Sequence, residues 1–431
     1  MKQISINKPR KVAFYTLGCK LNYAETSMIS RKFVENGYEH VGTKSDADII
    51  VINTCSVTQV AEKKCRQAIK KANDKGAKVV VVGCYSQLRP NEIAEIQGVD
   101  LVLGTKEKFH ILEYVEGLYN GQTINIFSEN SGEIDEYESA FSLNGRTRAF
   151  LKIQDGCDYY CSYCTVPLAR GKSRNESVEK IIGHAKKIAS SGIKEIVLTG
   201  VNIGDFGKTT NETFYQLICQ LEKIQQIERF RISSIEPNLV SDEIITFIAG
   251  SEKFVPHFHI PLQSGCNRIL SMMNRRYNRE LYLDRVNKIK SLMPFACIGS
   301  DIIAGFPGES EEDFFDSYKF IESLNIDYLH VFPYSERPNT RAVSIVAKVK
   351  SFEKTNRCRM YSKLSDVKRA KFLKLNFGRQ EKVIFESKCI DGKMFGFTSN
   401  YIKVETSFKS ELIGKVVDVN LNTLNLKGFE V

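Results

Sequence analysis

The chain has 431 residues, of which 42% are hydrophobic and 26% are charged, a composition that excludes an intrinsically disordered protein. No apolar run approaches the roughly 18 residues of a membrane-spanning helix, and no apolar signal-peptide core is present, so we expect a cytoplasmic protein without a membrane partner. In a reducing compartment, those of its twelve cysteines that lie in motif spacing are better explained as metal ligands or catalytic thiols than as disulfides.

Residues 1–125 are predicted to form a Rossmann-like domain around a parallel sheet. Short apolar runs such as "ADIIVINTC" and "AKVVVVGC" alternate there with helical patterns such as "ETSMISRKFVENG". Three of the predicted strands end in a cysteine: Cys19, Cys55 and Cys84. Because parallel strands place their C-terminal ends along one edge of a sheet, we expect these three to meet. Cys65 lies instead on the apolar face of a predicted helix and is interpreted as a core residue.

A polar stretch over residues 126–145 is predicted to be a linker, and residues 146–372 then repeat the order strand, helix six times. The predicted strands are "AFLKIQ", "EIVLTG", "RFRISSI", "HFHIPL", "IGSDIIAG" and "YLHVFPY". Six such units are two fewer than a closed eight-fold barrel contains, so we predict a partial (βα)6 barrel. An open barrel of this kind admits a bulky substrate along its side.

Three cysteines follow the first barrel strand within eight residues: Cys157, Cys161 and Cys164. Loops at the C-terminal ends of barrel strands carry the chemistry in barrels of this kind. Thiolates suit zinc or iron–sulfur clusters, and this spacing lets three of them reach one centre. A structural zinc site has four protein ligands, whereas three ligands leave an open position, which a catalytic metal needs.

The net charge of +10 comes entirely from the end of the chain. Met1–Thr340 contains 42 Lys and Arg against 42 Asp and Glu, whereas Arg341–Val431 contains 19 against 9. Lys348–Lys374 alone has ten basic residues and two acidic ones, a pattern typical of either a solvated helix face or a contact with a phosphate backbone. Residues 373–431 change to short strands separated by turns, which predicts a small five-stranded β-barrel of a type that binds nucleic acid.

The loop "CDYYCSYC" resembles the signature of the radical S-adenosylmethionine superfamily, whose three cysteines hold a 4Fe-4S cluster with one iron left for S-adenosylmethionine. With its three-cysteine N-terminal domain and a C-terminal module similar to the TRAM RNA-binding domain, the chain resembles the methylthiotransferase family. "TLGCKLN" and "INTCSVTQVAEKKCRQ" look most like the branch that modifies N6-threonylcarbamoyladenosine at position 37, beside the anticodon of tRNA. The isopentenyladenosine and ribosomal-protein branches usually differ where Lys20 and Leu21 stand.

The resemblance implies a second, auxiliary 4Fe-4S cluster, held by Cys19, Cys55 and Cys84, beside the radical cluster on the barrel cysteines. It further implies that S-adenosylmethionine is cleaved to a radical that attacks C2 of the modified adenine, while the auxiliary cluster delivers sulfur. The implied partners are the anticodon stem-loop of tRNA, with its target base extruded, and an electron donor such as flavodoxin or ferredoxin.

Cosubstrate contacts are implied at or near the C-terminal ends of the barrel strands, where such groups are expected. These residues are Tyr163, Gly200, Asn202, Ser234, Glu236, Gln263, Asp301 and Ile303. Within this set, Tyr163 corresponds to the aromatic residue near the adenine, and Gly200 with Asn202 to the position that meets the methionine amino group.

Contacts with tRNA phosphates are expected from nine basic residues near the cluster loop and in the basic stretch. They are Arg170, Arg174, Arg275, Arg276, Arg357, Arg359, Lys368, Arg369 and Lys371. In the small barrel, Phe395, Phe397 and Tyr401 are interpreted either as base-stacking residues or as its core.

Three alternatives stay open from the sequence. The first is a methylthiotransferase that acts on isopentenyladenosine of tRNA or on an aspartate of a ribosomal protein, which would use the same clusters. The second is a non-catalytic iron–sulfur electron carrier, for which a barrel, a cosubstrate pocket and a basic tail would be surplus. The third is a zinc-dependent RNA-binding module.

Overall fold

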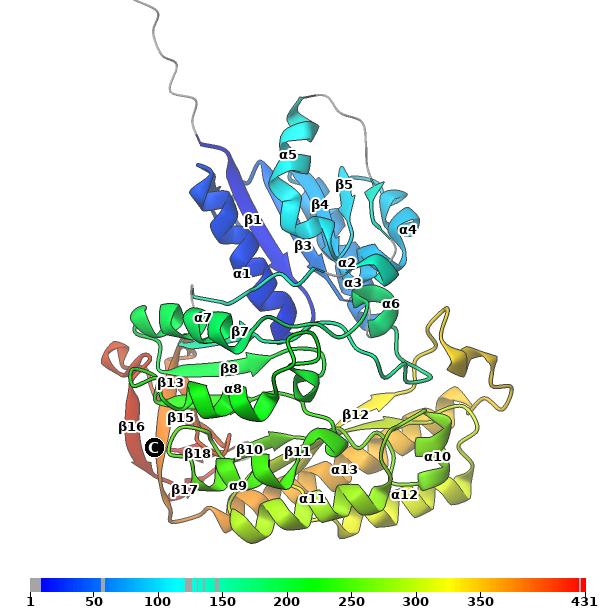
Figure 1. The fold of residues 1–431 in the computed structure, drawn as a ribbon, viewed down its shortest axis with the longest axis vertical. Coiled ribbons are helices and arrows are strands. Elements are labelled where there is room, and N and C mark those ends of the chain that lie inside the picture. Colours follow the sequence, from blue (N-terminus) through cyan, green and yellow to red (C-terminus); the bar gives the residue numbers. More distant parts are fainter. Residues whose placement is uncertain are drawn as a thin grey trace, which may run out of the picture. The chain divides into compact units, whose positions relative to one another are not determined.

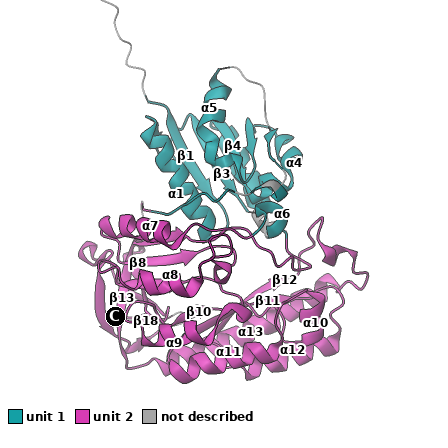
Figure 2. Ribbon diagram, viewed as in Figure 1, with its two compact units in different colours: residues 1–142, 165–172 teal, residues 143–164, 173–431 magenta. Residues whose placement is uncertain are grey.

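The computed structural model describes residues 9–55, 59–120, 126–129, 131–134, 136–143, 147–425 and 428–431. The chain divides into two compact units, which Figure 2 shows in two colours. The first comprises residues 1–142 with 165–172, and the second comprises residues 143–164 with 173–431. Within the described ranges, no helix combines the length and the apolar character needed to cross a membrane.

The first unit contains a six-stranded, fully parallel sheet with the strand order β2-β1-β3-β4-β5-β6. Its strands are β1 (Lys11–Thr16), β2 (Glu39–His40), β3 (Ile49–Thr54), β4 (Lys78–Gly83), β5 (Leu101–Leu103) and β6 (Ile126–Phe127). The predicted Rossmann-like arrangement is confirmed. However, β6 falls at the start of the range predicted to be a linker, and it completes the sheet instead.

Helices accompany this sheet, as Figure 1 shows. They are α1 (Lys20–Glu35), α2 (Gln59–Asn73), α3 (Cys84–Leu88), α4 (Pro90–Ala94), α5 (Ile111–Tyr119) and α6 (Val166–Arg170), with short 3-10 turns at η1 (Glu107–His110) and η2 (Ser131–Glu133). The last of these α-helices, α6, comes from a part of the sequence that directly follows the barrel cysteines.

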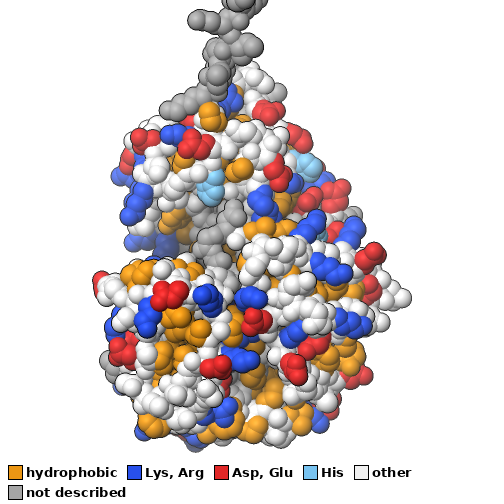
Figure 3. Space-filling view, turned by 90° about the vertical axis from the view of Figure 1, so that its left-hand side faces the viewer, with side chains coloured by type: hydrophobic (Ala, Val, Ile, Leu, Met, Phe, Trp, Pro, Cys, Tyr) orange, Lys and Arg blue, Asp and Glu red, His pale blue; other side chains and the backbone are white. Residues whose placement is uncertain are grey.

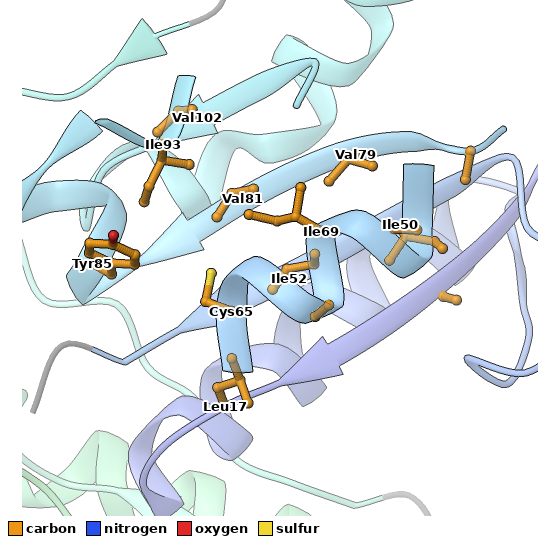
Figure 4. Packing of buried hydrophobic residues seen from close by; sticks show 14 residues of the cluster. Leu17, Ile50, Ile52, Cys65, Ile69, Val79, Val81, Tyr85, Ile93 and Val102 are labelled. Carbon is orange, nitrogen blue, oxygen red and sulfur yellow. The ribbon is translucent and has the colours of Figure 1, made fainter. Parts of the chain in front are cut away.

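The sheet of the first unit is covered on both faces, as parallel sheets usually are. Successive residues of β3 alternate between two hydrophobic clusters, with Ile50 and Ile52 in one and Ile49 and Val51 in the other. Figure 4 shows the first cluster, in which Cys65 of α2 lies among apolar side chains. The prediction that Cys65 is a core residue is confirmed.

The second unit begins with six parallel strands that form two three-stranded sheets, β7-β8-β9 and β10-β11-β12. The strands are β7 (Arg148–Lys152), β8 (Glu195–Thr199), β9 (Arg229–Ile232), β10 (His257–His259), β11 (Cys297–Ala304) and β12 (Tyr328–Pro333). Single parallel bridges, such as that between Ser234 and His259, connect the two sheets. All six predicted barrel strands are therefore present, in an arrangement that fits a partial (βα)6 barrel.

The barrel helices follow their strands, and Figure 1 shows α11, α12 and α13 along one side of β10–β12. They are α7 (Val178–Ser190), α8 (Phe214–Leu221), α9 (Asp242–Gly250), α10 (Asn267–Met272), α11 (Arg279–Leu292), α12 (Glu311–Ser323) and α13 (Ser351–Leu375), with 3-10 turns at η3 (Ile203–Asp205), η4 (Pro237–Leu239) and η5 (Arg341–Ser344). Side chains cap several of these helices: Ser177 accepts from the backbone of α7, and Ser310 forms a capping box with Asp313 at α12.

The last part of the second unit is a curled, mostly antiparallel sheet with the order β16-β13-β14-β15-β18-β17. Its strands are β13 (Gln380–Ile390), β14 (Lys393–Thr398), β15 (Lys403–Ser407), β16 (Val416–Asn420), β17 (Thr423–Leu424) and β18 (Phe429–Glu430), with a 3-10 turn at η6 (Ser410–Leu412). Five strands were expected, and β17 is an additional two-residue strand. Val383, Phe385 and Val404 lie in its buried core.

Buried arginines of the partial barrel hold this sheet in place within the second unit. Arg229 donates to the carbonyl oxygens of Phe397 and Lys382 at 3.1 and 2.5 Å. Arg231 donates to the carbonyl oxygen of Ser399 at 3.0 Å and to Glu195 Oε1 at 2.9 Å. Burial alone would raise the pKa of Glu195, but the neighbouring arginines, Arg231 foremost, outweigh it and lower the pKa.

The two aromatic residues Phe397 and Tyr401 belong to the same junction. The centroids of their stacked rings are 4.8 Å apart. The Tyr401 ring also stacks on His257 of the partial barrel, with a centroid distance of 4.5 Å. Arg148 lies over the Phe397 ring at 4.8 Å. These two rings therefore pack against the partial barrel, which favours the core interpretation over base stacking.

Candidate functional site

The barrel cysteines lie in a loop that is fixed to the end of β7. Asp155 and Arg174 exchange two backbone hydrogen bonds of 2.9 Å, and Arg174 Nη2 also approaches the Asp155 carboxylate at 3.3 Å. Lys152 Nζ lies 2.7 Å from the same carboxylate. All three side chains are buried, so this ion-paired closure holds the base of the loop.

Within the loop, local geometry turns the chain around the thiols. Gly156 and Tyr160 have positive φ values of 68° and 48°, and the Cys164 backbone N donates to the Cys161 carbonyl at 3.0 Å. Ser162 anchors the loop, since its backbone N donates to Met273 O at 3.0 Å and its carbonyl accepts from Ala342 N at 2.8 Å. The cysteine loop is thus held by the segments that follow α10 and β12.

Of the thiols in this loop, Cys161 is buried, whereas Cys157 and Cys164 are half-buried. Burial raises the pKa of Cys157 to about 12 and also raises the pKa of Cys161, where Arg275 opposes the effect. Arg275 Nη1 lies 3.0 Å from Cys161 Sγ, and its Nη2 is paired with Glu236. Burial raises the pKa of Glu236, against the lowering effect of Arg275.

Two predicted cosubstrate residues, Gly200 and Asn202, directly follow β8 and lie close to Gln154. Gln154 Oε1 accepts from the backbone N atoms of Val201 and Asn202 at 3.0 and 2.8 Å. A Cβ added at Gly200 would lie 2.8 Å from the Gln154 carbonyl, so only glycine fits there. Asn202 Nδ2 donates to Asp205, whereas its Oδ1 is buried without a hydrogen-bond partner among the described residues. An orphaned buried acceptor suits a ligand that donates.

The other predicted cosubstrate residues lie in strands β9–β11 or shortly after them, except Tyr163, which lies in the cysteine loop. Ser234 pairs with His259 in a single bridge, and His259 Nε2 lies 3.0 Å from Asp301 Oδ1. The backbone N of Gln263 donates to Asp301 O at 2.8 Å, and Ile303 N donates to Gln263 O at 2.9 Å. Tyr163 packs edge-on against Phe306 with a centroid distance of 6.4 Å.

The second cysteine trio lies at the edge of the sheet in the first unit. Cys19 precedes α1, Cys55 follows β3 and Cys84 begins α3, and their strands β1, β3 and β4 are adjacent. A Cβ added at Gly18 would lie 2.7 Å from Cys55 Cβ, so the loop after β1 closely approaches Cys55. The three strand ends therefore lie next to one another at one edge of the sheet, while the meeting of the three thiols stays a prediction.

Asn22 organises this edge. Its Nδ2 donates to Leu17 O and Thr54 O at 2.8 and 3.0 Å, which ties the segment before Cys19 to the end of β3. Its Oδ1 accepts from Arg170 Nη2 at 2.8 Å. Asn22 is not among the residues predicted from the sequence, because a lone asparagine in a helix carries no spacing signal.

The nine predicted RNA contacts divide into two groups. Five are buried and bonded within the protein, which leaves no room for a phosphate and corrects the expectation for them: Arg170, Arg174, Arg275, Arg357 and Lys368. Four are exposed: Arg276, Arg359, Arg369 and Lys371. On the face shown in Figure 3, basic and acidic side chains of the described residues are interspersed.

Neither trio resembles a mononuclear site. Among the residues that the structure describes, no group of three Cys, His, Asp or Glu side chains could hold a metal ion. An iron–sulfur cubane does not require such convergence, because each thiolate ligates a different iron. Cysteine sulfurs near arginine donors, at Cys84 and Cys161, are compatible with a cluster, since the cluster with its thiolates is anionic and polarisable.

Comparisons with known proteins agree with this arrangement. The model of Uncharacterized protein family UPF0004 matches residues 11–104, and that of the Radical SAM superfamily matches residues 151–321. Threonylcarbamoyladenosine tRNA methylthiotransferase MtaB of Aquifex aeolicus (strain VF5) is 40% identical over 418 residues, which cover 95% of this chain and 99% of that protein. The chain belongs to the radical SAM methylthiotransferase family. It is thus an enzyme, and neither an electron carrier nor a zinc module.

A relative with another substrate in its name and a solved structure are also similar to this methylthiotransferase. tRNA-2-methylthio-N(6)-dimethylallyladenosine synthase of Endomicrobium trichonymphae is 32% identical over 416 residues, 94% of this chain and 96% of that protein. The structure of the radical S-adenosylmethionine methyltransferase TsrM from Kitasatospora setae, with cobalamin and a 4Fe-4S cluster bound, has a TM-score of 0.59 at 13% identity and covers 78% of this chain and 77% of that one. That likeness concerns the fold. The cofactors of the family are S-adenosylmethionine and 4Fe-4S clusters.

Proposed function

We propose that this methylthiotransferase installs a methylthio group at C2 of N6-threonylcarbamoyladenosine at position 37, beside the anticodon of tRNA. The observation that carries the proposal is the 40% identity, over almost the whole chain, to a protein named for that tRNA reaction. Relatives named for dimethylallyladenosine are 31–33% identical, so the isopentenyladenosine reading is less well supported. The ribosomal-protein reading has no separate observation in its favour.

The two cysteine trios are assigned to the two clusters. Cys157, Cys161 and Cys164 would hold the radical cluster, and Cys19, Cys55 and Cys84 the auxiliary cluster. When bound, these groups supply the electron that cleaves S-adenosylmethionine and the sulfur that is transferred. A flavodoxin- or ferredoxin-type protein would deliver the electron.

The chain's own residues bind and orient the cosubstrate. Asn202 offers its buried Oδ1 to the methionine ammonium group, and Gln154 fixes the backbone around it. Tyr163 and Ile303 provide apolar surface beside the cysteine loop, suited to an adenine. Cys161 and Ser162 of the loop are buried, which limits the access of water to this part of the site.

The nucleoside content of tRNA tests the function. Mass spectrometry of tRNA from cells that lack the protein should show loss of the methylthio group on threonylcarbamoyladenosine. The wild-type gene should restore it, and a Cys84→Ala gene should not. Cys389→Ser is the matched control, because Cys389 is exposed and belongs to neither trio, and it should restore the modification fully.

Other outcomes would change the assignment. Loss of the methylthio group on isopentenyladenosine alone would move the substrate to that nucleoside. Unchanged amounts of both modified nucleosides would contradict a role in tRNA modification. Full restoration by Cys84→Ala would remove the auxiliary cluster from the reaction.

A further inference from the structure

Arg170 lies against the cysteine trio of the first unit. Its Nε donates to Cys84 Sγ at 3.3 Å, and Arg170 is only 2% exposed. Nη1 donates to Glu25 Oε1 at 2.9 Å, and Nη2 donates to Asn22 at 2.8 Å. Each of these bonds is charge-assisted or buried, so the guanidinium is held in the orientation that faces the sulfur.

The carboxylate that holds Arg170 is itself fixed. Glu25 is fully buried and accepts from Lys108 Nζ at 2.7 Å as well as from Arg170. A buried carboxylate between two cations is a costly arrangement that persists only when its geometry is satisfied. The network therefore positions a cationic donor beside a cysteine sulfur.

The trio of the second unit has a matching arginine. Arg275 Nη1 lies 3.0 Å from Cys161 Sγ, and its side chain is 3% exposed. Glu236 binds the same guanidinium, and Nε donates to Tyr277 OH at 3.0 Å. Tyr277 in turn donates to the Pro261 carbonyl at 2.8 Å. Each trio thus has one buried arginine that a glutamate holds with an N–H on a cysteine sulfur.

We infer that Arg170 and Arg275 are positioning residues that raise the reduction potentials of the clusters on their respective trios. The inference rests on the cluster assignment of the proposed function. One-electron reduction would add a negative charge to the cluster, part of which is delocalised onto its sulfur ligands, and an N–H donor with a positive charge stabilises that state. In a buried site the interaction is weakly screened, so each arginine should act mainly on its own trio.

Redox titration of single-cluster proteins tests this inference. Two full-length backgrounds are reconstituted anaerobically with iron and sulfide, one with Cys157, Cys161 and Cys164 changed to Ala, the other with Cys19, Cys55 and Cys84 changed to Ala. Dithionite titration followed by electron paramagnetic resonance gives the ratio of reduced to oxidised cluster at each potential. Neither measurement depends on catalytic turnover.

In the first background, Arg170→Met should lower that ratio at least tenfold at a fixed potential, a shift of about 59 mV to lower potential. Arg275→Met should leave this background unchanged and should produce the same shift in the second one. Arg170→Lys keeps the charge but loses the planar fork, so its shift should be smaller than that of Arg170→Met.

Loss of a buried partner must be separated from loss of the donor. The double variant Arg170→Met with Glu25→Gln removes both charges of this ion pair. In the first background it should show the same shift in reduction potential as Arg170→Met alone, and its circular dichroism spectrum should match that of the wild type. Unchanged ratios, equal shifts in both backgrounds, or loss of iron from a folded variant would overturn the inference. If the first background, without any arginine substitution, failed to bind iron, the assignment of an auxiliary cluster to Cys19, Cys55 and Cys84 would be contradicted instead.

Discussion

Asn202 is the residue whose surroundings point most directly to the cosubstrate. Its backbone and Nδ2 are bonded within the protein, while Oδ1 has no partner among the described residues. A hydrogen bond to a charged group contributes about 1.5–3 kcal/mol, so we expect Asn202→Ala to weaken S-adenosylmethionine binding roughly tenfold to a hundredfold. Equilibrium dialysis with the anaerobically reconstituted protein measures this.

A matched control lies on α13. Asn356→Ala removes the same amide far from the barrel strands in sequence, and it should leave the dissociation constant of S-adenosylmethionine unchanged. Equal affinities of wild type and Asn202→Ala would show that Oδ1 does not contact the cosubstrate.

At this scale, the sequence identifies chemistry that depends on local spacing and misses chemistry that depends on distant pairing. The six cysteines stand in a short motif or at strand ends, and both signals are local. Arg170 pairs with Glu25 across 145 residues, and Arg229 reaches Phe397 across 168. A basic residue near a cluster loop therefore looks like an RNA contact until its buried carboxylate is seen.

Helix α13 has buried basic side chains on one face and exposed basic side chains elsewhere on its surface. Arg357 and Lys368 point inward, where Arg357 pairs with Glu309 and Lys368 donates to the Leu324 carbonyl at 2.7 Å. Arg359 and Lys371 are exposed. The spacing of the inward residues follows the helical period, so one stretch of basic sequence contains both structural and solvent-facing cations.

We expect the double substitution Arg359→Ala with Lys371→Ala to weaken tRNA binding. If each cation contacts one phosphate, the slope of log affinity against log salt concentration should fall by about 1.4–1.8, because each contact contributes about 0.7–0.9. Filter binding over a series of salt concentrations gives the slope.

Lys223→Ala provides the comparison, because Lys223 is exposed beyond α8 and outside the basic helix. It should leave both affinity and slope as in the wild type. An unchanged slope for the α13 double variant would show that tRNA does not bind this helix.

Element prediction succeeds where hydrophobic runs are long. All six barrel strands and the four main strands of the first sheet coincide with apolar runs in the sequence. β6 and β17 have two residues each and carry too little pattern to be found. The placement of α6 was also missed, because its five residues give no sign of which unit they join.

For the whole molecule, the Arg231–Glu195 pair is one of the contacts that hold the C-terminal sheet against the partial barrel. Both side chains are 1% exposed, and Arg231 also donates to backbone carbonyls of the C-terminal sheet. Breaking a buried pair by removing one partner costs about 3–5 kcal/mol. We expect Arg231→Met to lower the free energy of unfolding by that amount and to expose the segment after Leu375 to limited proteolysis.

Glu195→Gln combined with Arg231→Met should recover little of the loss, because Arg148 and Arg229 also pair with the Glu195 carboxylate, at 3.8 and 3.7 Å, and would lose that partner. The pair should also depend on pH. The pKa of Glu195 is lowered on folding, so its stabilising contribution is present above its unfolded-state pKa of about 4.3 and is lost as pH falls toward the folded value. Equal acid sensitivity of wild type and double variant would contradict this account.

Residues 165–172 belong to the first unit although the residues on both sides of them belong to the second, and this limits where the gene can be cut or recombined. The chain leaves the second unit after Cys164, contributes α6 to the first unit, and returns at Ser173. A gene truncated near residue 142 would encode a first unit without α6, whose Thr105 hydroxyl would lose its bond to the Ala169 carbonyl. Swapping one half between homologues would pair α6 with a foreign sheet, so recombination at a single junction is disfavoured and the two halves are expected to be inherited together.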